Sequence, residues 1–324
     1  MKNPKVVALG GGHGLYASLS ALRTVTDRLT GVVTVADDGG SSGRLRRELG
    51  VIPPGDLRMA LAALCGDDEW GRTWSEVIQH RFRSEGDLHE HAVGNLLIVA
   101  LWELLGDTVA GLGWVGRLLG AQGRVLPMAT VPLDIVADVL GADPARPDGI
   151  TQVRGQVACA STPGKVLGVS LVPPDPPASP EALQAIHEAD WVVFGPGSWF
   201  TSVLPHLKVP ELQRALVETP ARRVVALNLA PQPGETDDFS QQAHLEVLAE
   251  HAPDLRIDVV LADEGVVEEP EALDKAVQEL GGTLMLAEVA MKDGSPRHDP
   301  ALLAQAFVQI FATGTGGSRN PGDW

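Results

Sequence analysis

Two adjacent aspartates and the small residues after them are the part of this sequence best suited to chemistry. Asp37 and Asp38 end a predicted strand that contains Val32, Val33 and Val35, and a glycine- and serine-rich segment follows. Backbone N–H groups in such a segment can surround an anion, because glycine has no Cβ and tolerates positive φ. The carboxylates suit a ribose hydroxyl, a Mg²⁺ ion or a transferred proton. The predicted ligand-binding residues here are Asp37, Asp38, Gly39, Gly40, Ser41, Ser42 and Arg44.

A second segment, PPGDLR from Pro53, again places an acid beside a base. Asp56 and Arg58 are its charged side chains, and both are predicted ligand-binding residues. A plain turn is the alternative for this segment taken alone, because proline and glycine commonly mark turns. Together with the aspartate segment it contains more glycine and charge than a simple connection requires, so we interpret the two as one binding site.

A glycine segment near the amino terminus joins a predicted strand, Lys5–Leu9, to a predicted helix, Leu15–Arg23. The pattern GxGxxA that starts at Gly12 fits the loose dinucleotide-binding fingerprint, and Asp37 lies at about the expected distance for a ribose ligand. The alternative is a tight strand-to-helix turn without a ligand. We expect the histidine of this segment to point at a ligand cleft. The predicted binding residues are Gly11, Gly12, His13 and Gly14.

A third glycine segment, GPGSWFTS, follows the predicted strand Trp191–Phe194 and leads to His206. Asn228 lies near the end of another predicted strand, Val224–Leu229. Ligands of open α/β sheets bind at the carboxyl ends of the strands. The glycine and polar clusters therefore predict one cleft built from segments that are distant in sequence. The binding residues predicted in this half are Gly195, Gly197, Ser198, Thr201, Ser202 and Asn228.

Residues 57 to about 123 have a helical pattern and are predicted to form an insertion. His89 and His91 could ligate a metal ion, but a His-x-His pair without a third ligand nearby is weak evidence, so no metal site is predicted. We expect His91 and Asn95 instead to face the cleft at the start of a helix and to contact a polar ligand. The helices predicted in the insertion are Leu57–Leu64, Trp74–Phe82 and Leu96–Leu105.

The remainder of the chain alternates between predicted strands and helices. Arg124–Leu140 and Gly155–Leu171 are β-rich, and the second is predicted to be a hairpin that turns at Ser161–Gly164. Pro173–Pro180 is predicted to be a stiff connector. The later predicted elements are the helices Pro180–Glu188 and Ser240–His251, the strands Trp191–Phe194, Val224–Leu229, Ile257–Leu261 and Leu284–Val289, and a terminal helix from Asp299 to near Ala312.

Arg297 precedes the terminal helix, where Pro296 stiffens the chain. A guanidinium held there suits bidentate contact with a diphosphate, so Arg297 completes the set of predicted binding residues. The alternative for Arg297 is a surface salt bridge. The order of elements predicts an α/β fold: a Rossmann-like, mostly parallel sheet with helices on both faces and a helical insertion. Residues 1–312 are expected to form a single domain, and residues 313–324 a flexible tail.

Composition restricts the class of protein and of partner. The 324 residues include 42 acidic and 25 basic side chains, a net charge of -17, which disfavours a nucleic-acid surface. Two cysteines provide neither a disulfide framework nor a zinc quartet. The amino terminus lacks the apolar run of a signal peptide, and the longest apolar segment, Leu96–Leu105, is about half a membrane span. We therefore expect a cytoplasmic protein without a membrane span.

Six segments of the chain form an ordered set: GGGHGL from Gly10, ADDGGSSGRLRRELG from Ala36, PPGDLR from Pro53, HAVGNLL from His91, GPGSWFTS from Gly195 and NLAPQPGETDDFS from Asn228. They resemble the motifs of the gluconeogenesis factor family, whose fold is similar to that of the phospholactate transferases of coenzyme F420 biosynthesis. The resemblance implies a cytoplasmic regulator that binds UDP-sugars such as UDP-N-acetylglucosamine and supports cell shape and growth on gluconeogenic carbon sources. His13 and Met59 depart from the family pattern, in which threonine and asparagine are frequent at these positions.

Three functional hypotheses remain. The first is a UDP-sugar-binding regulator, whose partner is a UDP-sugar or another nucleotide diphosphate, with no catalytic residue and no firm cofactor. The second is a metal-dependent transferase of the phospholactate transferase type, with Mg²⁺ held by Asp37 or Asp38. The third is a dinucleotide-dependent oxidoreductase, which the pattern at Gly12 favours and the glycine segment at Gly195 opposes. The sequence leaves open whether the chain forms a homo-oligomer.

Overall fold

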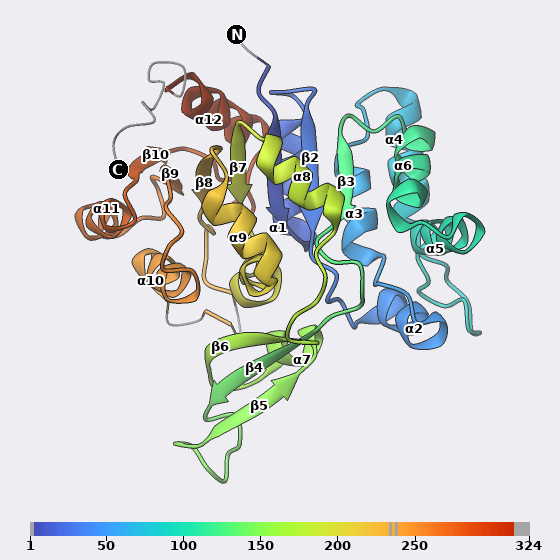
Figure 1. The fold of residues 1–324 in the computed structure, drawn as a ribbon, viewed down its shortest axis with the longest axis horizontal. Helices are drawn as coiled ribbons and strands as arrows, with labels where there is room; N and C mark the ends of the chain where they lie inside the picture. Colours follow the sequence, from blue (N-terminus) through green and yellow to red (C-terminus); the bar gives the residue numbers. More distant parts are fainter. Residues whose placement is uncertain (1–2, 233–234, 237–238, 314–324) are drawn as a thin grey trace.

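A parallel sheet of seven strands forms the centre of this computed structural model, which describes residues 3–232, 235–236 and 239–313 (Figure 1). Its strands are β1 Val6–Gly10, β2 Leu29–Val33, β3 Arg124–Pro127, β7 Trp191–Phe194, β8 Arg222–Ala226, β9 Val259–Asp263 and β10 Thr283–Ala287. Every neighbouring pair in the order β10-β9-β8-β7-β1-β2-β3 is parallel. The central strands are near-continuous apolar runs because both of their faces are buried.

The helices around this sheet include α1 Gly12–Leu22, α8 Pro180–Glu188, α9 Pro210–Glu218, α10 Gln241–His251, α11 Pro270–Glu279 and α12 Pro300–Thr313. Figure 1 shows α8 and α9 over one face of the sheet, with α1 and α12 on the other. The predicted α/β fold with a parallel sheet and helices on both faces is therefore confirmed. Helices α9 and α11 were not predicted from the sequence.

The direction in which the chain crosses the sheet reverses at β1. β2 and β3 extend from one side of β1, and β7, β8, β9 and β10 extend from the other. The boundary between the paired strands β1 and β7 is therefore a topological switch point, the place at which open α/β sheets bind ligands.

Five helices lie between β2 and β3 in the chain: α2 Gly40–Leu49, α3 Gly55–Ala63, α4 Glu69–Gln79, α5 Val93–Leu105 and α6 Thr108–Leu119. Figure 1 shows them beside the β3 edge of the sheet. α4 begins five residues before its predicted start at Trp74, because Asp68 caps it by accepting a hydrogen bond from the N–H of Gly71 (2.7 Å). The sequence pattern did not separate α6 from its neighbours.

A smaller antiparallel sheet projects from the main sheet (Figure 1). We call residues 134–172 the arm; it consists of β4 Asp134–Leu140, β5 Ile150–Arg154, α7 Gln156–Ser161 and β6 Lys165–Val172. The predicted hairpin over Gly155–Leu171 is wrong, because a helix occupies its first half. The carboxylate of Asp38 accepts a hydrogen bond from the N–H of Val157 (3.0 Å) at the start of this helix, a stabilising contact that local sequence does not reveal.

Other boundaries also differ from the prediction. β2 ends at Val33, so the two aspartates after it lie in a loop and not at the strand end. The predicted β-rich segment Arg124–Leu140 divides between the main sheet and the arm. No helix in the described part of the chain is both long and apolar enough to cross a bilayer. The predicted flexible tail begins at Thr313, which the structure instead places in the last helix, Pro300–Thr313. Residues 314–324 of that prediction lie outside the described residues.

Candidate functional site

Two glycine loops meet at the switch point between β1 and β7. Gly14, in the first turn of α1, packs against the loop after β7, since a Cβ built on Gly14 would lie 2.1 Å from the carbonyl oxygen of Pro196. A Cβ on Gly11 would lie 2.5 Å from Asp56 Oδ2. Neither position has room for a side chain, so this close approach requires glycine. The structure thereby brings together segments that are distant in sequence.

A cavity of about 530 Å³ opens beside the two loops, within the size range of small-molecule sites. Ten residues predicted to bind a ligand line it: Gly11, Gly12, His13, Gly14, Asp37, Asp56, Gly197, Ser198, Thr201 and Ser202. Six further lining residues were not among those predicted: Met59, Gln156, Val157, Ala160, Gln232 and Glu235. The arm and the loop after β8 contribute five of these six, and both segments lack the glycine clusters that guided the prediction.

Three buried acceptor atoms in the cavity wall have no hydrogen-bond partner among the described residues. They are Oδ2 of Asp56, Oε1 of Gln156 and Oε1 of Gln232. A buried polar group without a partner costs about 1–3 kcal/mol of stability. The cavity therefore suits a ligand that donates several hydrogen bonds through hydroxyl or amide groups.

Asp37 and Asp56 place two carboxylates in the same wall. Asp37 Oδ1 accepts a hydrogen bond from Gly39 N–H (2.9 Å), but burial outweighs it and raises the pKa of Asp37. Burial, followed by repulsion from Asp37, raises the pKa of Asp56 to about 7, against an opposing hydrogen bond from Gly12. A proton or a cation would relieve this repulsion, and carboxylate oxygens suit Mg²⁺. Within the described ranges, no group of three or more His, Cys, Asp or Glu side chains is placed to hold a metal ion.

Glu235 is a third buried carboxylate, in the loop after β8. Its Oε1 accepts hydrogen bonds from Ser198 Oγ (2.6 Å) and Thr201 Oγ1 (2.9 Å), and its Oε2 accepts one from the N–H of Phe200 (3.3 Å). Burial raises the pKa of Glu235, and these hydrogen bonds oppose the rise. The carboxylate thereby occupies donors of the GPGSWFTS loop, including two hydroxyls that the sequence predicts as ligand contacts.

Five residues predicted to bind a ligand form a buried polar network behind the cavity wall: Ser41, Ser42, Arg58, His91 and Asn95. Asn95 donates a hydrogen bond to Ser41 Oγ (3.0 Å) and accepts one from Arg58 Nε (3.0 Å). His91 Nδ1 lies 3.1 Å from the same Ser41 hydroxyl. The network joins α2, α3 and α5 and hydrogen-bonds to Asp37, so it positions the aspartate loop. Direct contact of its members with a ligand stays a prediction.

Asn228 and Asp38 support the wall from outside the cavity. Asn228 Oδ1 accepts a hydrogen bond from Gly197 N–H (2.8 Å), and Asn228 Nδ2 donates one to the Gly197 carbonyl (2.9 Å). Asp38 holds α7 through Val157 (3.0 Å). The ligand contacts predicted for both side chains remain predictions. Three further predicted glycines shape adjoining turns without lining the cavity: Gly39, Gly40 and Gly195.

The two remaining predicted residues are arginines with protein partners. Arg44 donates to two backbone carbonyls in the loop between α4 and α5 (3.1 and 2.6 Å). Arg297 is exposed and forms an ion pair with Asp293 (3.0 Å). The next residue, His298, hydrogen-bonds to the backbone of Leu227, which places this segment at the carboxyl end of β8. Arg44 and Arg297 do not line the cavity, and their contact with a ligand stays a prediction.

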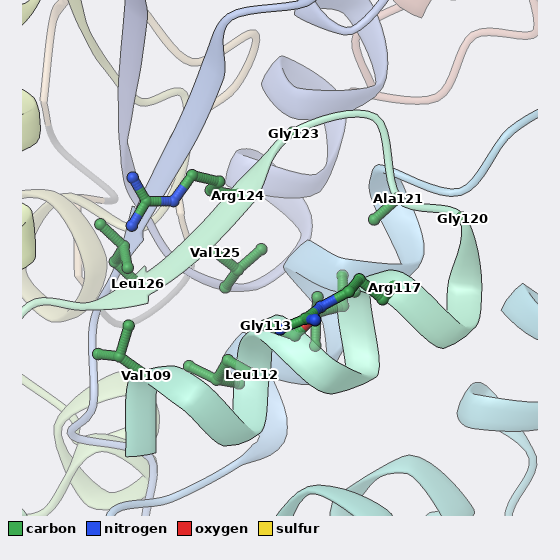
Figure 2. Close-up of a pocket in the computed structure, with 12 residues that line it drawn as sticks. Val109, Leu112, Gly113, Arg117, Gly120, Ala121, Gly123, Arg124, Val125 and Leu126 are labelled. Carbon is green, nitrogen blue, oxygen red and sulfur yellow. The ribbon is translucent and has the colours of Figure 1, made fainter. Parts of the chain in front are cut away.

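A second cavity, of about 340 Å³, lies between α6 and the edge strand β3 (Figure 2). Its wall is mainly apolar side chains and glycine, and the guanidinium of Arg117 lies over the ring of Trp114, 4.2 Å from its centroid. None of the unpartnered buried polar atoms in the described residues lines this cavity. The cavity at the switch point is therefore the better candidate for a polar ligand.

The chain matches, over residues 6–290, the family described as 2-phospho-L-lactate transferase CofD. A Mycobacterium tuberculosis protein provisionally named gluconeogenesis factor is 53% identical over 319 residues, 98% of this chain and 93% of that protein. The gluconeogenesis factor of Halalkalibacterium halodurans is 35% identical, with 95% and 97% of the two chains covered. A crystal structure of a Bacillus halodurans protein, 33% identical, superposes with a TM-score of 0.84 over 95% of this chain and 100% of that one. This chain therefore belongs to the gluconeogenesis factor family and, with it, to the CofD family.

Proposed function

We propose that this protein is a cytoplasmic regulator that binds a UDP-sugar of the UDP-N-acetylglucosamine type in the cavity at the switch point. The observation that carries the proposal is a set of acceptors on Asp56, Gln156 and Gln232 that have no partner among the described residues, in a cavity of about 530 Å³. Sugar hydroxyls and an acetamide N–H supply the donors that these atoms lack. Two relatives named gluconeogenesis factor support a role in gluconeogenesis. From the resemblance of the six sequence motifs we extend the proposal to growth on gluconeogenic carbon sources and to cell shape.

The glycine loops suit the diphosphate of such a ligand. Gly12 N–H hydrogen-bonds to Asp56, but the next N–H groups of α1 have no intrahelical partner, and Gly11, its N-cap residue, provides no capping side chain. Backbone N–H groups at a helix start favour an anion. We assign the hydroxyls of the ligand to Asp37 and Asp56, because carboxylates accept hydrogen bonds from hydroxyls and repel phosphate.

Thermal denaturation tests this proposal. UDP-N-acetylglucosamine at about 100-fold its Kd should stabilise the purified protein by about 2.7 kcal/mol and raise its Tm. NAD should leave the Tm unchanged, because the cavity is assigned to a sugar nucleotide. UDP is a further control that separates binding of the nucleotide from binding of the sugar. Equal shifts with UDP-N-acetylglucosamine and NAD, or no shift with the UDP-sugar, contradict the proposal.

A second candidate function is a Mg²⁺-dependent transferase of the phospholactate transferase type, which the carboxylate pair Asp37 and Asp56 favours. Asp38 hydrogen-bonds to α7 (3.0 Å), so we assign the metal to Asp37 and Asp56. Mg²⁺ would polarise a phosphoryl oxygen of a bound nucleotide conjugate there. Turnover of a nucleotide conjugate that requires Mg²⁺ and is lost in Asp37→Asn would favour the transferase. Binding of a UDP-sugar without turnover would favour the regulator.

A further inference from the structure

Three donors in the loop after β7 hold a carboxylate of the protein itself. Glu235 accepts hydrogen bonds from Ser198 Oγ (2.6 Å), Thr201 Oγ1 (2.9 Å) and the N–H of Phe200 (3.3 Å). We call these donors the anion cradle. A phosphate group carries oxygen acceptors of the same kind as a carboxylate, so two hydroxyls and an N–H that converge on one can bind the other. The cradle opens onto the cavity, because Ser198, Thr201 and Glu235 all line it.

The cradle and its carboxylate are buried together. Only 6% of Glu235 is exposed, and Thr201 is exposed by 2%. Ser198 is also the N-cap of the helical turn Trp199–Val203, where its hydroxyl accepts a hydrogen bond from Thr201 N–H (3.2 Å). The hydrogen bonds from the cradle offset part of the cost of burying the charge of Glu235. The converging donors therefore make a group rich in acceptor oxygens the natural occupant of this position.

We propose that Glu235 competes internally with the phosphate of the ligand: it occupies the anion cradle in the ligand-free protein and leaves the cradle when phosphate binds. This inference rests on the proposed function, because it adds a regulatory step at the same site. Two like charges at hydrogen-bonding distance repel each other strongly when both are buried in the same site. The ionised carboxylate and a phosphate thus exclude each other, and displacement of Glu235 lowers the affinity of the wild-type protein for the anion.

Calorimetric titration with inorganic pyrophosphate tests the competition directly. We expect Glu235→Ala to bind pyrophosphate at least tenfold more tightly than the wild type, a change of about 1.4 kcal/mol. Glu235→Gln removes the charge but keeps an acceptor and the side-chain volume, so its affinity should lie between the two. Glu181→Gln is a matched control, because Glu181 also lies beside a serine hydroxyl (Ser179 Oγ, 3.1 Å) but does not line the cavity. Its affinity should equal that of the wild type.

Several outcomes would overturn the inference. Circular dichroism first shows that the variants are folded. Pyrophosphate binding that is unchanged or weaker in both Glu235 variants then contradicts the inference. The absence of pyrophosphate binding in every variant contradicts it as well. A parallel titration with UDP-N-acetylglucosamine separates this inference from the proposed function. If the UDP-sugar fails to bind while the Glu235 variants bind pyrophosphate more tightly, the proposed function fails and the competition stands. If Glu235→Ala binds the UDP-sugar more weakly than the wild type, Glu235 is a ligand contact and the inference is wrong.

Discussion

Gly14 and Gly197 touch each other across the switch point of the sheet. A Cβ on Gly14 would lie 2.4 Å from Gly197 Cα, and a Cβ on Gly197 would lie 3.6 Å from Gly14 Cα. Helix α1 and the loop after β7 therefore approach this closely only because Gly14 has no side chain. The contact fixes the relative position of the two loops that line the cavity.

Replacement of Gly14 should distort this contact. We expect Gly14→Ala to lower the free energy of unfolding by about 1–3 kcal/mol, because the added methyl group overpacks the interface. Gly113→Ala in α6 is a matched control, since a Cβ there meets no atom within 4 Å. This control should stabilise the helix by about 0.5–1 kcal/mol. Urea denaturation of both variants measures the difference, and a stabilising effect of Gly14→Ala would show that the loops can separate without cost.

Asp37 and Asp38 should respond differently to the same substitution. Asp37→Asn should weaken UDP-sugar binding by about 1.5–3 kcal/mol, the scale of a hydrogen bond to a charged group. It should not lower the Tm, because it also removes the repulsion between Asp37 and Asp56. Asp38→Asn should instead lower the Tm, because it weakens the acceptor that Val157 N–H uses at the start of α7. Calorimetry and thermal denaturation of both variants separate the two roles. Early melting of both, with normal binding once folded, would assign both aspartates to structure alone.

The pH dependence of stability should change when Asp56 is replaced. Its pKa is about 7 in the folded protein against an ordinary value of 3.8, so the folded state binds the proton more tightly than the unfolded state. The stability that this group contributes is present below about pH 4 and is lost as pH rises to about 7, by up to about 4 kcal/mol. Asp56→Asn removes that loss. We expect its Tm to exceed that of the wild type at about pH 8 and to approach it at about pH 4.

Asp293→Asn is a control of opposite sign for this experiment. Hydrogen bonds from Ser295 and the ion pair with Arg297 lower the pKa of Asp293 to about 2. The contribution of Asp293 is therefore present above about pH 4 and is lost as pH falls toward 2. Thermal denaturation of the wild type and both variants across this range measures the trends. A difference between Asp56→Asn and the wild type that does not vary with pH contradicts the assignment.

Arg297→Glu should lower the affinity for a UDP-sugar at least tenfold, about 1.4 kcal/mol, without a change in the ligand-free Tm. The guanidinium would exchange Asp293 for a phosphate, and an exposed ion pair costs little to break. Arg146→Glu is a matched control, because Arg146 forms a similar exposed pair with Asp143 (2.9 Å) in the connection between β4 and β5 and does not line the cavity. Its affinity should equal that of the wild type. An unchanged affinity in Arg297→Glu would make this arginine a surface residue only.

The elements that local interactions determine could be predicted from the sequence. α8 and β7 have their predicted bounds, because a proline at the helix start and a four-residue apolar run are local features. α12 begins after Asp299, whose carboxylate accepts a hydrogen bond from Ala301 N–H (2.8 Å), as its sequence indicates. α7 could not be predicted in this way, since Asp38, the residue that caps it, lies 119 positions from Val157 in the chain.

The candidate site also combines residues that could be predicted from the sequence with residues that could not. Glycines and adjacent acids marked the loops at Gly14, Asp37 and Gly197, because backbone approach and charge need those residue types. Gln156 and Gln232 are ordinary amides in sequence, and only the structure shows that their buried oxygens have no partner among the described residues. Polar residues at a helix start can either contact a ligand or hydrogen-bond to one another, and the sequence alone does not distinguish the two. The buried residues around Asn95 hydrogen-bond to one another.

The two sides of the cavity belong to different parts of the chain. Gln156, Val157 and Ala160 lie on α7 of the arm, whereas the glycine loops follow strands of the main sheet. Substitutions on α7 can therefore alter the shape and polarity presented to a sugar while β1 and β7 keep their packing. We expect this separation to make the fold modular: sugar preference can diverge in the arm while anchoring of the diphosphate is inherited unchanged.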